Sequence, residues 1–421
     1  MSLFSLKLNK VYDATITSLE NEGGGVCKIN SMVVFVPKSL VGEKVRVQIT
    51  EIKKKYARAK LLEVIEKSDS RVNSNCPYYN ECGGCNLRHQ DYNTNLSFKK
   101  NKVELALNKI GKINITVDDV IPSVKVDNYR NKASFKVEKD KIGFYKENTY
   151  QLIDIDNCLL LEKEINNTLN VIRKYIKKNP NNDIYNITIK YGNAFDEILI
   201  DVSSKKNSDS NIVDYLINNV KRLKTLIYND KIVFGNGYIS QMTNDLLFKC
   251  SSKSFFQVNS LMKEKLYDLA IKNTELSKED ILLDLYCGTG TISIIASNHV
   301  KKVIGIEINS DAVCDAINNA KLNRINNVKF ICGNANKEIS KITEKIDVIF
   351  VDPPRGGLDR KTIAFIKKIN PKKITYISCN PITLARDLSY FNDLYDIKKV
   401  IPVDMFPNTS HVECVCVLKL R

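Results

Sequence analysis

One segment sets the architecture of this chain: Ile281-Leu282-Leu283-Asp284-Leu285-Tyr286-Cys287-Gly288-Thr289-Gly290. Its apolar start predicts a buried strand, and its glycines let the backbone approach a ligand closely at the N-terminus of the next helix. The turn is not the G-x-G-x-x-G dinucleotide fingerprint, because Ser293 stands where the third glycine would be. A generic nucleotide-binding turn and a purely structural turn stay open as alternatives.

From about residue 251, strand-like apolar runs alternate with helical ones. The expected strands lie at 281–285, 302–307, 328–332, 347–351 and 374–379, followed by a terminal pair at 398–403 and 413–420. This alternation predicts a doubly wound, mostly parallel α/β sheet over residues 251–421.

Two further domains are expected upstream of that sheet. Residues 1–66 hold several short strand-like runs separated by turns, which predicts a small OB-like β-barrel. Residues 67–250 mix strands with helices and predict a central α+β domain. Its helical stretch over 92–118 can instead pack on the C-terminal domain.

The charge of the chain favours a nucleic-acid partner. The 421 residues carry a formal net charge of +16, which attracts polyanions, although abundant Lys, Asn and Ile also fit a coding bias. The loop Lys53-Lys54-Lys55-Tyr56-Ala57-Arg58 pairs charge with an aromatic ring, as a platform for single-stranded nucleic acid does. A solvated charge run would look the same.

The twelve cysteines are expected to serve metal binding or catalysis rather than disulfides. The first residues have no uninterrupted apolar signal region, and no run approaches the roughly 18 apolar residues of a membrane span. We therefore expect a cytoplasmic protein that does not enter a membrane.

Two acidic residues stand at strand ends near the glycine turn. Glu307 ends the strand after the turn, where it can accept hydrogen bonds from ribose hydroxyls. Asp352 ends the fourth strand, and Pro353 and Pro354 stiffen the loop that follows. The glycine turn with its acidic strand end resembles the S-adenosylmethionine site of class I methyltransferases. Asp-Pro-Pro also occurs at this place in amino-methyltransferases.

Cys379 ends the fifth strand, and Asn380-Pro381 is expected to stop that strand in a turn. A buried apolar filler is one interpretation of this residue, since free cysteine is among the most buried residue types. The other is a nucleophile, because thiolate adds well to electron-poor double bonds. The last strand should run antiparallel and start at the same sheet edge with His411 and Glu413. Thiolate addition to C6 of uracil activates C5 for methylation, and a base must then remove the C5 proton.

The cysteines Cys76, Cys82 and Cys85 form a C-x5-C-x2-C cluster whose glycines let the chain wrap a ligand. Zinc and an iron–sulfur cluster both fit this spacing, and each needs a fourth ligand. Cys158 is the best candidate because it follows in the same expected domain, and His89 is the alternative.

Taken together, these motifs resemble those of bacterial RNA uracil-5-methyltransferases of the iron–sulfur, ribosomal-RNA-modifying kind, over nearly all of the chain. The resemblance is carried by the barrel, which is similar to a TRAM domain, and by the cysteine cluster. It also rests on Ser254-Phe255-Phe256-Gln257-Val258-Asn259, Asp284–Gly290, Asp352–Arg355, Ser378-Cys379-Asn380-Pro381 and His411-Val412-Glu413.

The resemblance implies roles for individual residues. Cys379 would be the nucleophile and Glu413 the proton acceptor. Contacts to S-adenosylmethionine or to the target base would come from Gln257, Tyr286, Glu307 and Asp352, and the ligands of a 4Fe–4S cluster would be Cys76, Cys82, Cys85 and Cys158. The family often has an acid after the third strand, where this chain has Gly333-Asn334.

The resemblance also implies a function. We expect a monomeric, S-adenosylmethionine-dependent enzyme with a Rossmann-like C-terminal domain that forms 5-methyluridine in RNA, above all in 23S ribosomal RNA, through a covalent cysteine–C6 adduct. Three alternatives stay open: methylation of transfer RNA, an amino-methyltransferase, and an RNA-binding iron–sulfur protein without catalysis.

Overall fold

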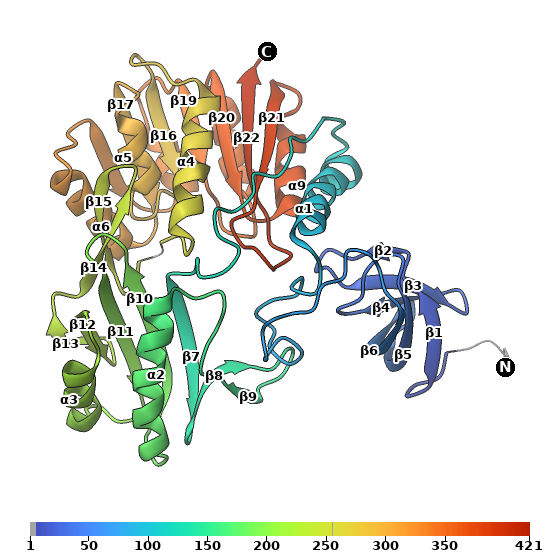
Figure 1. Ribbon diagram of the computed structural model, residues 1–421. Coiled ribbons are helices and arrows are strands. Elements are labelled where there is room, and N and C mark those ends of the chain that lie inside the picture. The colour runs from blue at the N-terminus through green and yellow to red at the C-terminus, as the bar shows by residue number, and fades with distance from the viewer. Residues whose placement is uncertain (1–5, 255) are drawn as a thin grey trace.

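The computed structural model describes residues 6–254 and 256–421 and shows two large sheets with a smaller one at the N-terminal side (Figure 1). Phe255, quoted above within a motif, lies outside the described residues. No helix among the described residues combines the length and the apolar character that crossing a membrane requires.

The N-terminal sheet has six short strands in the order β1-β5-β6-β4-β3-β2. Along β5, inward apolar residues such as Val45, Val47 and Ile49 alternate with exposed polar ones, so one face of the strand packs into a small apolar core. The strands are β1 (Val11–Thr15), β2 (Ser18–Leu19), β3 (Gly25–Ile29), β4 (Met32–Val36), β5 (Lys44–Ile52) and β6 (Tyr56–Glu66).

The central sheet has seven strands in the order β13-β12-β11-β10-β7-β8-β9. Helices α2 (Lys163–Lys178) and α3 (Ser210–Asn219) pack their apolar sides onto it and close a separate core. The strands are β7 (Lys132–Glu138), β8 (Lys141–Tyr145), β9 (Leu152–Asp154), β10 (Ile184–Gly192), β11 (Glu197–Ser204), β12 (Leu223–Tyr228) and β13 (Lys231–Gly235). The hairpin of β14 (Tyr238–Thr243) and β15 (Leu246–Ser251) leads on to the C-terminal domain and contributes Phe248 and Cys250 to its core.

The C-terminal sheet has seven strands in the order β18-β17-β16-β19-β20-β22-β21. All neighbours are parallel except β22, which runs antiparallel between β20 and β21. The strands are β16 (Ile281–Leu285), β17 (Lys302–Glu307), β18 (Val328–Cys332), β19 (Val348–Val351), β20 (Lys373–Ser378), β21 (Tyr395–Val403) and β22 (Glu413–Leu420). The predicted α/β fold is thus confirmed.

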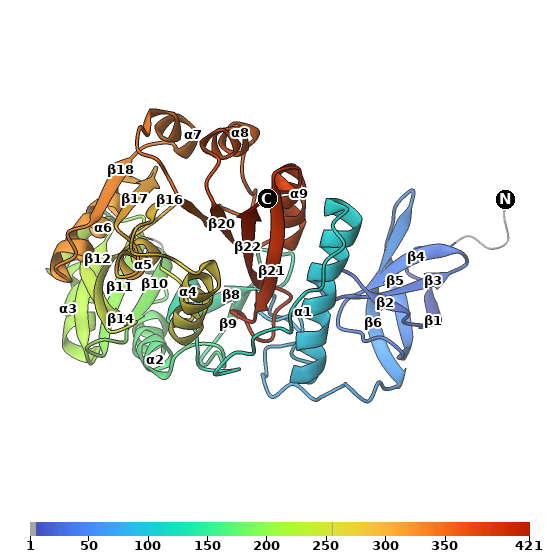
Figure 2. The ribbon, with the colours of Figure 1, turned by 90° about the horizontal axis from the view of Figure 1, so that it is seen from above.

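Helices cover both faces of this sheet (Figure 2). One face packs against α4 (Ser260–Thr274), α5 (Thr291–Ser297) and α6 (Ser310–Leu322). The other packs against α7 (Ala335–Glu338), α8 (Arg360–Ile369) and α9 (Pro381–Phe391). Because both faces are covered, the central strands are mostly apolar, as the fully buried β19 shows; Asp284 in β16 is an exception.

Helix α1 (Tyr92–Ala106) belongs to this second face although it precedes the central sheet in sequence. Asp91 caps its start by accepting from the Thr94 N–H at 2.9 Å, and a π-helical turn over Leu107–Gly111 ends it. At Gly111 a Cβ would lie 2.8 Å from the Ala385 carbonyl oxygen, so only glycine permits this close approach to α9. The segment between the N-terminal sheet and the central sheet therefore packs on the C-terminal domain.

Replacing Leu107 by Ala should lower the free energy of unfolding by about 2–5 kcal/mol, because its buried side chain lies in the core beside α9. Thermal and denaturant unfolding of the full chain would measure this. Leu105→Ala is the matched control from the same segment: its side chain is 42% exposed, so the change should be small. Equal effects of the two substitutions would contradict the packing of the end of α1 and its π-helical turn in this core.

Candidate active site

The loop after β16 is shaped to receive a ligand. Tyr286, Gly288 and Gly290 all have positive φ, at 65°, 54° and 73°. At Gly290, the residue before α5, a Cβ would meet the Phe330 ring at 2.7 Å, so a larger residue is excluded there by space as well as by conformation. The loop therefore brings bare backbone to the N-terminus of α5.

Glu307 lies beside this loop at the end of β17. One of its carboxylate oxygens accepts from the Gly288 N–H at 3.1 Å and the other from the Asn309 N–H at 2.8 Å. Beneath the loop, Asp284 is fully buried, and burial raises the pKa of its carboxyl to about 7 although Ser293 donates to it. Two acids thus flank the glycine turn, one inside the sheet and one at its edge.

The other residues predicted to contact the cofactor occupy different positions around the same edge. The Tyr286 side chain is half-buried and packs on the core near Thr362 of α8. Gln257 is buried ahead of α4, where its carbonyl accepts from Asn131 Nδ2 at 3.2 Å. Asn334 is exposed and uses its side-chain oxygen to cap α7, accepting from the Asn336 N–H.

Cys379 and Glu413 meet through the antiparallel pairing of β20 with β22. Ser378 lies opposite Cys414, so the next residues along, Cys379 and Glu413, face each other at the strand ends. Asp352 follows β19, the neighbouring strand on the other side of β20. The three side chains that the sequence assigned to catalysis or to the cofactor are thus brought to one edge of the sheet.

Burial governs the proton affinities at this edge. It raises the pKa of Glu413 to about 8, with Asp352 adding repulsion and the Arg355 guanidinium opposing it. Burial likewise raises the pKa of Asp352 to about 7. The Cys379 thiol has its pKa raised to about 11, first by burial and then by the negative charge of Glu413 and Asp352. The ionised form of a carboxyl with a pKa near 8 is a stronger base than an ordinary glutamate, and the ionised fraction grows as the pH rises towards 8.

Local hydrogen bonds fix the backbone at Cys379. Asn380 was predicted to form a turn with Pro381, but it caps α9 directly by accepting from the Ile382 N–H at 3.1 Å, with Pro381 in the first helical turn. The Asn380 side chain also donates to the Arg355 carbonyl at 3.1 Å. The loop after Asp352 is thereby tied to the end of β20 at Cys379.

A cavity of about 910 Å³ adjoins this edge and draws its lining from every part of the chain. The C-terminal domain contributes Gln257, Arg355 and His411, although no role was predicted for Arg355. Further basic residues that line it are Lys38 and Arg58 from the N-terminal domain and Arg130 and Lys146 from the central region. They outnumber the acidic residues of the lining, which are Glu20, Glu22 and Glu147. Sequence reasoning missed most of these residues, because nothing in their spacing indicates that they meet.

All four predicted cluster ligands line a second cavity, of about 330 Å³. It lies between the central sheet and the segment 76–85, here called the cysteine loop. The four ligands are Cys76, Cys82, Cys85 and Cys158. Burial raises the pKa of the Cys85 thiol to about 12 and also raises that of Cys158. His89 is not part of the lining; it is buried against Tyr79, whose hydroxyl lies 2.5 Å from His89 Nδ1.

The donor chemistry of these four thiols fits an iron–sulfur cluster, because thiolates are the usual ligands of such clusters. Thiolates also bind zinc. Among residues 6–254 and 256–421, no group of three or more His, Cys, Asp or Glu side chains is arranged to hold a metal ion.

Known proteins match this chain over nearly its full length. A family model described as tRNA (uracil-5-)-methyltransferase matches residues 91–421, and one described as the TRAM domain matches residues 6–62. Uncharacterized RNA methyltransferases are similar: that of Caldanaerobacter subterraneus is 38% identical, covering 98% of this chain and 99% of its own. That of Clostridium acetobutylicum is 35% identical, covering 98% of both.

A solved structure also matches. The Pyrococcus abyssi tRNA (uracil-54, C5)-methyltransferase in complex with S-adenosyl-L-homocysteine superposes with a TM-score of 0.80 at 26% identity, covering 96% of this chain and 99% of its own. The similarity includes the N-terminal sheet as well as the α/β domain, because so little of either chain is left uncovered.

Replacing Glu413 by Gln should stabilise the protein at high pH. The folded-state pKa of Glu413, about 8, lies above its ordinary value of 4.5. The stability that its neutral form provides is therefore complete below about pH 4.5 and is lost as pH rises through about 8. In denaturant unfolding we expect Glu413→Gln to exceed the natural protein by on the order of 3 kcal/mol near pH 9 and to match it near pH 4.

Glu279→Gln is the control for this experiment, because Glu279 is exposed and its replacement should change the pH profile little. A Glu413→Gln variant whose stability followed that of the natural protein at every pH would show that Glu413 is not buried as described.

Proposed function

The chain belongs to the tRNA (uracil-5-)-methyltransferase family of S-adenosylmethionine-dependent RNA methyltransferases, and from this membership we propose that it methylates C5 of uridine through a covalent adduct with Cys379. One observation carries the proposal: Cys379 and Glu413 face each other across paired strands, with Asp352 on the next strand. Methylation at carbon needs a nucleophile and a base at one place, whereas methylation at an amine nitrogen needs neither.

The reaction follows from these positions. The Cys379 thiolate forms a bond to C6 of uracil, and the electron pair of the C5–C6 double bond shifts so that C5 becomes nucleophilic. S-adenosylmethionine supplies a sulfonium methyl group when bound. Once C5 carries the methyl group, Glu413 removes the C5 proton, the double bond re-forms and the bond to Cys379 breaks. Cys379 and the ring are regenerated, and Glu413 leaves the step protonated.

The glycine loop and its flanking acids would hold the cofactor. The backbone at Gly288 and Gly290 would leave room for the methionine part, and Glu307 would accept from the ribose hydroxyls. Tyr286 would contribute through its backbone at the loop, since its ring packs on the core. Gln257 and Asp352 lie on the side of the target base, where Asp352 also borders Cys379.

The four-cysteine cavity is proposed to hold a 4Fe–4S cluster ligated by Cys76, Cys82, Cys85 and Cys158. Such a cluster supplies cross-links between the cysteine loop and the central sheet. Its support is the common lining of one cavity by four thiols from two distant segments. We assign it a structural role, because the cysteine loop it would order contributes Gly83 and Gly84 to the large basic cavity.

Ribosomal RNA is the proposed substrate and transfer RNA the second candidate. The cysteine cluster favours ribosomal RNA through the family resemblance. The Pyrococcus abyssi relative, however, is named for transfer RNA and covers the N-terminal sheet too, so that sheet does not distinguish the two. In either RNA the uridine must leave its stack to reach Cys379. We further propose that the protein is a monomer in the cytoplasm.

Cys379→Ala should abolish methyl transfer, by at least about a thousandfold, because no adduct can form. The natural protein should trap covalently on RNA containing 5-fluorouridine, since fluorine at C5 cannot be removed as a proton. Denaturing gels with labelled S-adenosylmethionine would show both results. Cys332→Ala is the matched control: Cys332 is an exposed cysteine at the end of another strand of the same sheet. Retained methylation in Cys379→Ala would refute the covalent mechanism, and parallel assays of ribosomal and transfer RNA would identify the substrate.

Protein purified without oxygen should contain iron and acid-labile sulfide in equal amounts, with broad absorption near about 400 nm. Cys158→Ser should lose most of both, because it removes one of the four ligands. Cys314→Ser, at an exposed cysteine on α6, should lose neither. Stoichiometric zinc in place of iron, or equal iron in the two variants, would refute the cluster.

A further inference from the structure

The loop between β21 and β22, residues 404–412, is almost entirely buried although it has no regular structure. A buried loop must find partners for its backbone groups from elsewhere, because unpaired carbonyls cost free energy. This loop leads directly into Glu413, so whatever satisfies it also sets the position of the proposed base.

Its carbonyl groups are satisfied by donors from four separate segments. Lys99 and Lys102 of α1 donate to the carbonyls of Phe406 and Ser410, at 3.0 and 2.9 Å. Three more donors complete the set: Asn259 to Met405 at 3.0 Å, Tyr129 to Pro407 at 3.2 Å, and the Leu87 N–H to Asn408 at 3.1 Å. The N-terminal sheet adds Glu22, which accepts from the Ser410 hydroxyl at 2.9 Å. Every domain therefore contacts this one loop.

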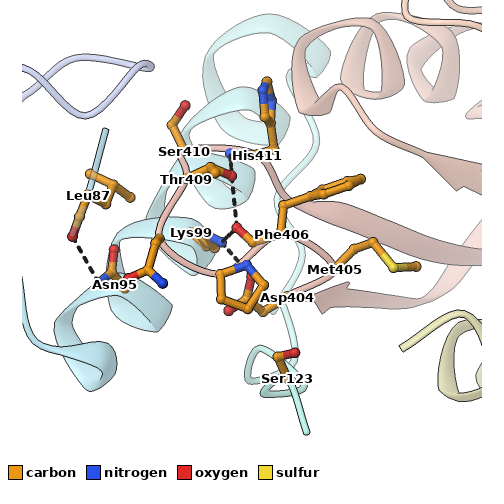
Figure 3. A network of polar contacts seen from close by, with 12 residues as sticks. Leu87, Asn95, Lys99, Ser123, Asp404, Met405, Phe406, Thr409, Ser410 and His411 are labelled. Carbon is orange, nitrogen blue, oxygen red and sulfur yellow. Dashed lines mark hydrogen bonds and ion pairs between the residues drawn. The ribbon is translucent and has the colours of Figure 1, made fainter. Parts of the chain in front are cut away.

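A buried ion pair lies at the base of the loop (Figure 3). Lys99 Nζ lies 2.5 Å from an Asp404 carboxylate oxygen, and both side chains are 0% exposed. The other Asp404 oxygen accepts from the Tyr92 hydroxyl at 2.8 Å, and that hydroxyl accepts from the Ser123 N–H at 2.7 Å. One carboxylate thus joins α1, the segment that follows α1, and the loop between β21 and β22.

Asp404 directly follows Val403, the last residue of β21. Val403 lies opposite Glu413 in the register of β21 and β22, and the Asp404 N–H donates to the Ile121 carbonyl at 2.9 Å. Movement of Asp404 therefore displaces the backbone directly across from Glu413. Asp404 does not itself line the basic cavity.

We propose that Lys99 and Asp404 are positioning residues, which hold the 404–412 loop so that Glu413 faces Cys379; this rests on the proposed function. An apolar pair of similar volume would serve stability equally well or better, because desolvating two charges is costly. The ion pair instead fixes α1 against the end of β21 at a defined register. The segments that line the large cavity can also influence the position of Glu413 through the 404–412 loop.

The test is the double variant Lys99→Met/Asp404→Leu, which removes both charges and leaves none buried without a partner. We expect its melting temperature and RNA affinity to stay close to those of the natural protein, while kcat falls about 10–100-fold with KM little changed. We also expect a methylated Cys379–RNA adduct to accumulate on ordinary uridine RNA, because removal of the C5 proton has slowed. Gel shift and mass spectrometry of the adduct give the readouts.

The matched control is Lys100→Met/Asp119→Asn, which removes the neighbouring ion pair of the same helix. That pair has a similar length, 2.7 Å, but Asp119 is 95% exposed, and kcat should not change. Asp404→Asn is a second variant that keeps the side-chain shape but leaves the buried Lys99 without its charged partner. In it, the melting temperature should fall, amide hydrogen exchange over 404–413 should rise and the adduct should accumulate on the protein that remains folded.

Two failures can be told apart. In the first case, the natural protein forms 5-methyluridine, but the Lys99 and Asp404 variants keep its kcat. The same conclusion holds if their kcat falls only in proportion to the fraction of folded protein and no adduct accumulates. The positioning role is then wrong and the proposed function stands. If the natural protein itself forms no 5-methyluridine on ribosomal or transfer RNA, the proposed function is wrong and the positioning role with it.

Discussion

The antiparallel pairing of β22 with β20 is the constraint on which the candidate site depends. In a wholly parallel sheet, the residue beside the end of β20 would come from another strand end followed by a helix. Because β22 enters in the opposite direction, its first residue, Glu413, lies opposite Cys379. Strand pairing therefore brings Cys379 and Glu413 together without a mobile segment.

This arrangement carries a cost in stability that the surrounding structure must offset. Asp284 and Glu413 are buried and Asp352 is partly buried; all three carboxyls have raised pKa values, because burial disfavours their charged forms. The same burial makes Glu413 a stronger base than an exposed glutamate. Apolar packing on both faces of the sheet and the clamped 404–412 loop stabilise a site that would otherwise relax. Function and stability thus oppose each other at this edge.

Much of the fold could be predicted from the sequence, because its central strands are buried on both faces and are mostly apolar. The strand predicted at 281–285 is β16, and the one at 413–420 is β22. Strand order and the antiparallel last strand placed Asp352, Cys379 and Glu413 at one edge. The pattern failed locally at Asn380-Pro381, where residues that are typical of turns also begin helices.

Contacts between distant segments could not be predicted in this way. Lys99 and Asp404 are 305 positions apart, and a lysine on a helix usually lies in solvent. Likewise, Lys38, Arg58 and Arg130 meet Arg355 only because three domains border one cavity. Periodicity reports which face of an element is apolar, but it does not report which element covers that face.

The most direct measurement uses RNA that carries tritium at C5 of uridine. As the purified protein transfers methyl groups from S-adenosylmethionine, tritium released into water and methyl groups gained by the RNA should rise together in equal amounts, because C5 must lose its hydrogen for each methyl it receives. Methyl transfer without release of tritium would place the methyl on another atom and contradict the assignment of Cys379 and Glu413 to uracil C5 chemistry.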